Sequence, residues 1–377
     1  MFSVLINIFL FVLIIGFLTF IHELGHFLVA KAIKTKVYEF SLGFGPKLFS
    51  RGYKGTLYAI RIIPLGGFVK ILGDGDPGKE GEEIDLKKSK YNLNNKPKGL
   101  QIMVMLAGVF MNLLFAIIFY YIVLGMSGWR TNPLYINTDK INVVGASVER
   151  VIAYEVVPDG KASLAGVPEY GVIKEINGEG VNDREVLTKV IGENENVSVL
   201  MCYDSMDDCK EFLIDVNEEG KIDIYVAYGY ILDYSENKVL AGISYLINNM
   251  KISASVLRSM IGAAKETGDY TELSNTVSGP VGIFLIIDNF KSKGFVVLLS
   301  LVADLSVSLA VVNILPIPAL DGGRVFILLI EGVLRKDLNE KIKSIIINIS
   351  FALLIVLVIL IMIKDFLNID SMKEMFG

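Results

Sequence analysis

The chain has 377 residues, 53% of them hydrophobic, with a formal net charge of −5 and a mean hydropathy of +0.53. A composition this apolar excludes an ordinary soluble protein and indicates a membrane protein. About 20 consecutive apolar residues suffice to cross a bilayer, so the long apolar runs are candidate transmembrane helices.

Charged residues are unevenly distributed along the chain. Residues 31–99 carry 14 Lys and Arg against 7 Asp and Glu, whereas residues 126–293 carry 15 against 25. Loops rich in Lys and Arg stay on the cytoplasmic side of a membrane. We therefore expect residues 31–99 in the cytoplasm and the acidic block on the outer side. The acidic balance of that block and its lack of basic runs argue against nucleic-acid binding.

The first predicted span covers residues 1–30 and is followed by Lys31, Lys34 and Lys36, which mark its cytoplasmic end. A signal peptide would resemble this run, but it would carry a basic amino-terminal region and an Ala-x-Ala-like cleavage site. Neither is present in the sequence. We therefore interpret residues 1–30 as a retained transmembrane helix.

The only two histidines of the chain, His22 and His26, lie four residues apart near the end of this span, with Glu23 beside them. Residues i and i+4 share one face of a helix, so the two imidazoles can bind one metal ion, and Glu23 stands where a general base would stand. A chance match with two structural histidines is the alternative. An ionisable cluster within a membrane span favours the metal site. At the helical rise, His26 lies about 7–8 Å inside the cytoplasmic end.

Residues 37–75 are rich in glycine and include two stretches typical of strands, 56–63 and 68–72. Two interpretations remain open. One is a small soluble hairpin, and the other is a sheet that dips into the membrane beside the metal site, which requires its backbone to be buried in protein or to line a cavity.

The second predicted span covers residues 100–124 and contains Asn112, interpreted as a polar contact between helices. Residues 143–230 then alternate short strand-like and helix-like segments and predict a small α+β domain. Cys202 and Cys209 lie in this region, where a disulfide and two free thiols are both possible. Two cysteines are too few for a Cys-based zinc site.

Residues 245–293 begin with apolar residues at helical spacing, which predicts either an amphipathic helix at the outer membrane surface or a core helix of the outer domain. The segment 278–283 (Ser-Gly-Pro-Val-Gly-Ile) follows, and its composition predicts a rigid turn.

The third predicted span, residues 294–332, is interrupted between Asn313 and Gly323 by two prolines and two glycines. A broken helix at membrane depth implies a protein-lined or watery cavity. Asp321 lies in this break and is the natural third ligand, which gives a His₂Asp site with an open position for water. Asp304 lies in the same span and receives no role. Basic residues then precede a fourth span at 344–363, so the third span also ends in the cytoplasm.

Taken together, these motifs resemble the site-2 proteases, which are zinc intramembrane proteases. The segment 22–27 resembles the family's H-E-x-x-H motif, and residues 313–322 resemble its N-x-x-P-x-P-x-L-D-G motif. Residues 43–46 and 63–70 resemble the family's membrane-re-entrant β-loop, at about 55–75, and residues 145–230 resemble its PDZ domain. Tyr170 and Gly171 replace the Gly-Asp of the PDZ pattern, and Val109 replaces a proline of the second span.

The resemblance implies a polytopic α-helical membrane protein of about four transmembrane helices, with a re-entrant β-loop and an extracytoplasmic α+β PDZ-like domain. It implies a bacterial cytoplasmic-membrane location with the active site near the cytoplasmic side. Zn²⁺ would be held by His22, His26 and Asp321, with Glu23 as the general base. A transporter and an inactive PDZ-bearing scaffold are the alternatives, and the spans contain no internal repeat that would favour a transporter.

The resemblance also implies how substrate binds. The substrates would be single-pass membrane proteins, such as an anti-sigma factor or a signal-peptide remnant. An unwound stretch of substrate would add as a strand to the β-loop near Gly66, Gly67 and Phe68, with Asn313 holding its backbone. The PDZ-like domain would admit substrates whose outer domain has already been trimmed.

Overall fold

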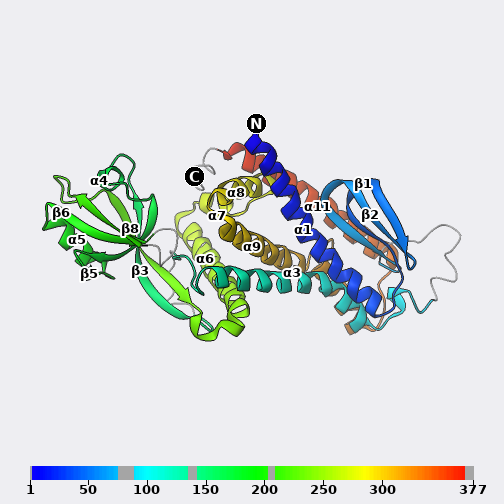
Figure 1. Cartoon of the computed structure of the whole chain (residues 1–377). Helices are drawn as coiled ribbons and strands as arrows, with labels where there is room; N and C mark the ends of the chain where they lie inside the picture. Colours follow the sequence, from blue (N-terminus) through cyan, green and yellow to red (C-terminus); the bar gives the residue numbers. More distant parts are fainter. Residues whose placement is uncertain (1, 75–88, 135–141, 203–208, 370–377) are drawn as a thin grey trace. The chain divides into compact units, whose positions relative to one another are not determined.

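The computed structural model describes residues 2–74, 89–134, 142–202 and 209–369 (Figure 1). The chain divides into two compact units, one formed by residues 1–119 and 269–377 and the other by residues 120–268. Residues 75–88 of the predicted cytoplasmic region and residues 203–208 of the predicted outer domain lie outside the described residues.

Within the residues that the structure describes, four helices are long and apolar enough to cross a membrane, which is the number that the sequence predicts. They are α1 (Phe2–Ala32), α3 (Lys98–Met126), α9 (Phe295–Ile314) and α11 (Glu340–Leu367). Of the most apolar 18-residue stretch of α11, only 6% is buried within the protein. Apolar side chains exposed all round a helix are stable in a hydrocarbon solvent and not in water. The chain is therefore an integral membrane protein.

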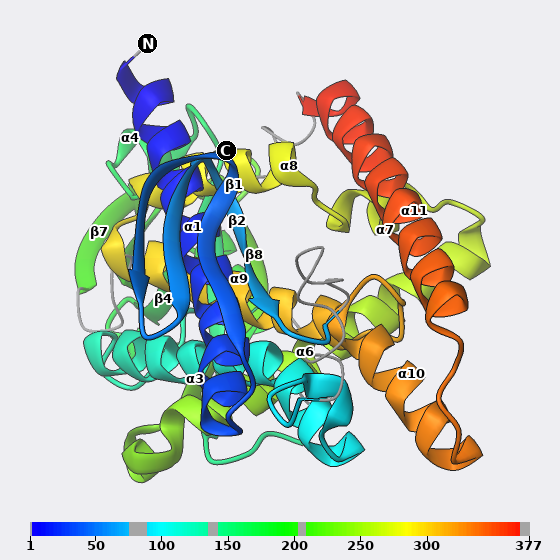
Figure 2. The same ribbon diagram turned by 90° about the vertical axis from the view of Figure 1, so that its right-hand side faces the viewer.

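Two long strands, β1 (Val37–Tyr53) and β2 (Thr56–Ile71), form a sheet beside α1 (Figures 1 and 2). Residues 39–42 of β1 pair with residues 67–70 of β2 on one side and with residues 57–60 on the other. The second half of β1 pairs with the start of β2 through a hairpin turn at Lys54 and Gly55. The two predicted stretches both belong to β2, and they lie on opposite sides of the same segment of β1. The chain reverses its direction between them, around Pro64 and Gly66, whose φ is +104°.

Helix α9 stops at Ile314, because Leu315 is extended and precedes Pro316. The chain resumes as α10 (Asp321–Leu334) after a loop, residues 315–320, whose Ala319 amide donates to Ser350 of α11 at 3.2 Å. The glycine pair at the start of α10 lets the chain turn tightly over this loop. A Cβ on Gly323 would lie 2.0 Å from the Ile317 carbonyl oxygen. The first residue of α10 is Asp321.

The prediction of a turn at residues 278–283 is wrong beyond Gly279. Pro280 is the first residue of helix α8 (Pro280–Ser292), the position at which the fixed φ of proline favours a helix. Asp365 of α11, which is fully buried, accepts hydrogen bonds from the amides of Gly279 at 2.8 Å and Gly282 at 3.0 Å. The segment is therefore the capped start of a helix. The short helix α7 (Thr271–Thr276) precedes it.

The second unit contains a sheet of strand order β7-β6-β4-β3-β8, with β5 (Glu179–Gly180) paired to β4. The other strands are β3 (Ser147–Val156), β4 (Tyr170–Ile176), β6 (Asn196–Cys202), β7 (Cys209–Asp215) and β8 (Ile224–Asp233). Helices α4 (Lys161–Leu164) and α5 (Arg184–Gly192) accompany it, and the Asp183 side chain caps α5. Leu187 and Ile191 of α5 pack against buried residues of β3, β4 and β6 to form the core.

Cys202 and Cys209 form a disulfide across the ends of β6 and β7, where the two residues pair directly. Helix α6 (Ala241–Thr267) follows β8 and a 3-10 turn, Ser235–Leu240. Its first half buries Leu246 and Asn248, while Ile243, Ile247 and Met250 remain exposed on the same turns. Helix α6 therefore both packs within its unit and presents an apolar stripe.

Candidate metal centre and active site

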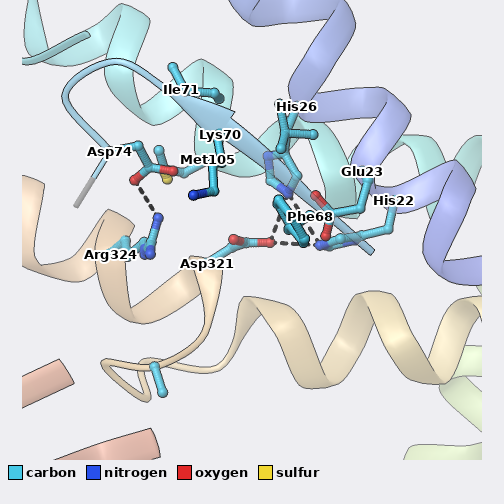
Figure 3. A pocket seen from close by; sticks show the side chains of 12 residues that line it. His22, Glu23, His26, Phe68, Lys70, Ile71, Asp74, Met105, Asp321 and Arg324 are labelled. Carbon is cyan, nitrogen blue, oxygen red and sulfur yellow. Dashed lines mark hydrogen bonds and ion pairs between the residues drawn. The ribbon is translucent and has the colours of Figure 1, made fainter. Parts of the chain in front are cut away.

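Three side chains, two from α1 and one from α10, converge on one point (Figure 3). Helix α1 presents His22 and His26 on the same face, with their Nε2 atoms 3.2 Å apart. The Oδ2 atom of Asp321, at the start of α10, lies 3.0 Å from the His22 Nε2 and 3.3 Å from the His26 Nε2. Within the described residues, these three possible ligand side chains have donor atoms that all lie within 4.8 Å of one another.

The spacing of these atoms fits a zinc ion. Ligands at about 2.0–2.1 Å from a tetrahedral Zn²⁺ are about 3.3 Å from one another. The three observed separations, 3.0, 3.2 and 3.3 Å, match this value. Asp321 Oδ2 is buried, and in the described part of the chain its close polar neighbours are the two ring nitrogens. Two imidazoles and a carboxylate form a zinc-binding donor set that leaves a fourth position open.

Helix α3 contacts the Nδ1 atoms of both imidazoles. Val104, Gly108 and Asn112 recur every four residues and so share one face of α3. The carbonyl oxygen of Val104 accepts from His26 Nδ1 at 2.8 Å, which leaves the His26 Nε2 with its lone pair. The Asn112 amide nitrogen lies 3.3 Å from His22 Nδ1. The two partners on α3 are thus matched to the two histidines on α1.

Gly108 leaves the space that the imidazoles occupy. A Cβ at this position would lie 2.5 Å from His26 Nε2 and 2.6 Å from His22 Cε1. The helices approach as closely on the other side of the contact, where a Cβ on Gly25 would lie 2.3 Å from the Ala107 carbonyl oxygen. Small residues at a helix crossing allow such close approach in membranes. Any side chain at residue 108 would displace the imidazoles.

A cavity of about 370 Å³ opens onto the three converging atoms. It is lined by residues of α1, β2, α3 and α10 and of the adjoining loops, namely His22, Glu23, His26, Phe68, Val69, Lys70, Ile71, Asp74, Met105, Ala319, Asp321 and Arg324. Figure 3 shows the Glu23 carboxylate beside the two imidazoles. Arg324, one turn after Asp321, pairs with Asp74, which follows β2. The ligand-bearing helix is thus tied to the end of the strand that lines the cavity.

The residues predicted to bind substrate are not all at the cavity. Phe68 lines it, together with the following three residues of β2. Gly67 approaches Glu23, since a Cβ there would lie 3.4 Å from the Glu23 Cγ. Gly66, whose φ is +104°, packs against Phe44, and neither glycine is among the lining residues. Asn313 is half-buried at the end of α9 and is also absent from the lining.

Several residues of this site received no site role from the sequence, among them Val104, Gly108, Asp74 and Arg324. Asn112 was predicted only to join helices. One signal could have found the α3 residues. Val104, Gly108 and Asn112 repeat the spacing of four that separates His22 from His26, and two helices that share this spacing can face each other in register. No comparable pattern links Asp74 to Arg324.

Comparison with known proteins is consistent with this geometry. The model of Peptidase family M50 matches residues 10–357. A protein of Clostridium perfringens, named as a zinc metalloprotease, is 33% identical over 352 residues, which cover 92% of this chain and 95% of the relative. One of Fusobacterium nucleatum with the same designation is 31% identical over 364 residues, covering 94% and 96%. The regulator of sigma-W protease RasP of Bacillus subtilis is 27% identical over 432 residues, covering 94% and 97%. The chain belongs to peptidase family M50, the family of the site-2 proteases.

Proposed function

We propose that this chain is a zinc-dependent endopeptidase that cleaves membrane-anchored proteins within or near their transmembrane segments. One observation carries the proposal: two imidazoles, a carboxylate and a glutamate meet at a cavity that is lined in part by α1 and α3, which are helices of membrane-spanning length. Ionisable groups are costly at such positions and are kept there for function. The relatives named as zinc metalloproteases match nearly the full length of the chain.

In this proposal, His22, His26 and Asp321 hold the zinc ion, and Glu23 is the general base. When bound, the ion would act as a Lewis acid and lower the pKa of a water molecule toward neutrality. Glu23 accepts a proton from the attacking water and returns it to the leaving amine. The Val104 carbonyl supports this assignment, because it holds His26 in the tautomer whose Nε2 faces Asp321.

The edge of the β1–β2 sheet is the proposed substrate-binding element. In the described chain, residues 67–71 pair with β1 on one side, and their side chains line the cavity from Phe68 onward. An unwound substrate segment that added to the free edge would bring a peptide carbonyl beside Glu23. Gly66, Gly67 and Phe68 would contact that segment. Asn313 remains a predicted backbone contact, and its half-buried position at the end of α9 leaves its side chain accessible.

We further propose that the sheet is immersed in the membrane. Large apolar side chains are exposed along its outer part, including Phe44, Leu48, Phe49, Ile60, Ile62 and Ile63. A hairpin with this surface would expose a large apolar patch in water. Because most of its backbone groups are paired between β1 and β2, the sheet meets the requirement that the hydrocarbon region imposes.

The second unit is proposed to be an extracytoplasmic PDZ-like domain that acts as a size filter. The disulfide between Cys202 and Cys209 supports an oxidising outer compartment. A groove between α5 and β8 is lined by Arg184, Glu185, Thr188, Lys189 and Tyr228. The Tyr228 hydroxyl accepts from the Arg184 amide at 3.2 Å, and the Arg150 guanidinium lies over the Tyr228 ring.

The positive-inside pattern supports a bacterial cytoplasmic membrane location with the active site near the cytoplasmic face. Substrates would be single-pass proteins, such as an anti-sigma factor or a signal-peptide remnant. The name of the RasP relative, a regulator of sigma-W protease, is in keeping with the first of these classes.

The test is cleavage of a membrane-anchored reporter by the Glu23→Gln variant, with zinc content measured on the same preparation. Loss of the general base should slow cleavage by about 10²–10⁴-fold while zinc content stays unchanged. Glu266→Gln, a change on the exposed surface of α6, is the matched control and should cleave at the wild-type rate. Wild-type cleavage by Glu23→Gln would remove Glu23 from the mechanism.

A further inference from the structure

Asn112 is a buried amide with one unsatisfied end. The residue is fully buried in α3, and its Nδ2 atom lies 3.3 Å from His22 Nδ1. Its Oδ1 atom is buried without a hydrogen-bond partner. A buried carbonyl oxygen that finds no donor costs about 1–3 kcal/mol. We therefore expect the Asn112 Oδ1 atom to have a hydrogen-bond donor beside it.

The chemistry of His22 supplies that donor. When a histidine binds a metal through Nε2, its other ring nitrogen carries a hydrogen and must donate it. The group that faces His22 Nδ1 must then be an acceptor, and an amide nitrogen is not one. The oxygen and nitrogen of an asparagine side chain have nearly the same shape, so their placement follows from the hydrogen bonds. Exchanging them places Oδ1 against the His22 Nδ1–H, so the carbonyl oxygen gains a donor and the amide nitrogen takes the position that lacks a partner.

His26 provides the internal comparison. Its Nδ1 faces the Val104 carbonyl oxygen at 2.8 Å, two turns of α3 before Asn112, and a carbonyl can only accept. The Nδ1 atom of each imidazole thus lies against one group of α3, namely the Val104 carbonyl for His26 and the Asn112 amide for His22. Ser306 of α9, also fully buried, donates to the backbone carbonyl of Asn112 at 2.8 Å and holds this point of α3 against the helix that leads to Asp321.

We propose that Asn112 is the positioning residue of His22: its Oδ1 accepts the Nδ1–H hydrogen bond that fixes the ring so that Nε2 points at the metal. This inference rests on the proposed metal site. It assigns to Asn112 more than the joining of helices, because a contact between helices would need no acceptor at this atom. Hydrogen-bond partners of zinc-bound histidines typically change metal affinity by about 10–100-fold when they are lost.

The first experiment measures zinc affinity of the full-length chain in detergent by competition with a chromophoric chelator. Asn112→Leu, which has no acceptor, should weaken zinc binding by about 10–100-fold. Asn112→Asp keeps the acceptor and should bind zinc at least as tightly as wild type. Asn249→Leu is the matched control, because it makes the same change at an amide of α6 that donates to the Tyr120 hydroxyl of α3 at 2.7 Å, away from the imidazoles, and it should bind zinc as wild type does. Wild-type affinity in Asn112→Leu, or equal weakening in Asn112→Asp and Asn112→Leu, would overturn the proposal.

A second measurement on the wild-type chain needs no variant to fold. Since the chain has only two histidines, histidine labelled with ¹⁵N gives four ring-nitrogen signals in an untagged, zinc-loaded sample. The proposal predicts that His22 carries its hydrogen on Nδ1; a hydrogen on the His22 Nε2 would contradict it. A wild-type chain that binds no zinc would instead refute the proposed function, so the two failures are distinguishable.

Discussion

Gly108→Ala adds a single methyl group to the centre of the proposed site. The new Cβ would lie 2.5 Å from His26 Nε2 and 2.6 Å from His22 Cε1, whereas ordinary contact begins at 3.4 Å. The atoms it meets are the ends of two side chains that can turn. The imidazoles, rather than the helix backbones, should therefore give way, by about 0.9 Å for His26 Nε2.

A shift of this size is large for a metal site, where ligand distances hold to about 0.2 Å. Misplacement of catalytic groups by about 1 Å can cost about 10²-fold in rate. We therefore expect Gly108→Ala to weaken zinc binding at least about tenfold, which corresponds to about 1.4 kcal/mol, and to slow cleavage about 10²-fold. Alanine is about 1 kcal/mol better than glycine within a helix, so the variant should still insert and fold.

The assay combines chelator competition for zinc, reporter cleavage and thermal unfolding of the metal-free chain. Gly99→Ala makes the same chemical change in the first turn of α3, where a Cβ would meet nothing within 4 Å, and it should match wild type in zinc binding and cleavage. The reasoning fails if Gly108→Ala binds zinc and cleaves as wild type does. It fails equally if Gly108→Ala loses folding as well as zinc, because the helix crossing itself would then need the glycine.

Three further outcomes are expected. Phe68→Pro removes a backbone donor from the proposed substrate edge and should slow cleavage more than it reduces zinc loading, whereas an equal loss of both would give the strand a structural role only. Asp365→Ala leaves the amides of Gly279 and Gly282 unsatisfied and should lower the free energy of unfolding by about 2–4 kcal/mol. Asp365→Asn keeps an acceptor and should lose less stability. Equal losses of the two variants in thermal unfolding would refute the capping role. A reporter with a large folded outer domain should be cleaved more slowly than its trimmed form, and equal rates would argue against a size filter.

The elements of the site that depend on short-range pattern were predictable. His22 and His26 recur at the helical spacing, and Asp321 follows a proline-rich interruption that a continuous helix cannot contain. Both signals arise from local backbone rules, so they are readable without knowing what packs against them. The four spans follow in the same way from the length and apolarity of their runs.

The partners of these residues depend on packing between distant segments. The Val104 carbonyl contacts His26 only because α3 crosses α1 at Gly108, and backbone carbonyls carry no sequence signature. The turn predicted at residues 278–283 is a helix start, because the acceptor that caps it is Asp365 of α11, far along the chain. The glycines and the proline of that segment are visible in the sequence, but the distant carboxylate that accepts from the glycine amides is not predictable from them.

The central claim is that residues from α1 and α10 hold one zinc ion between them. The direct measurement is the zinc content of the purified full-length chain beside that of Asp321→Ala, with both proteins shown to be folded. We expect about one zinc per wild-type chain and almost none in the variant, because two imidazoles alone leave the site with too few ligands. An Asp321→Ala protein that retains one zinc per chain would contradict the account.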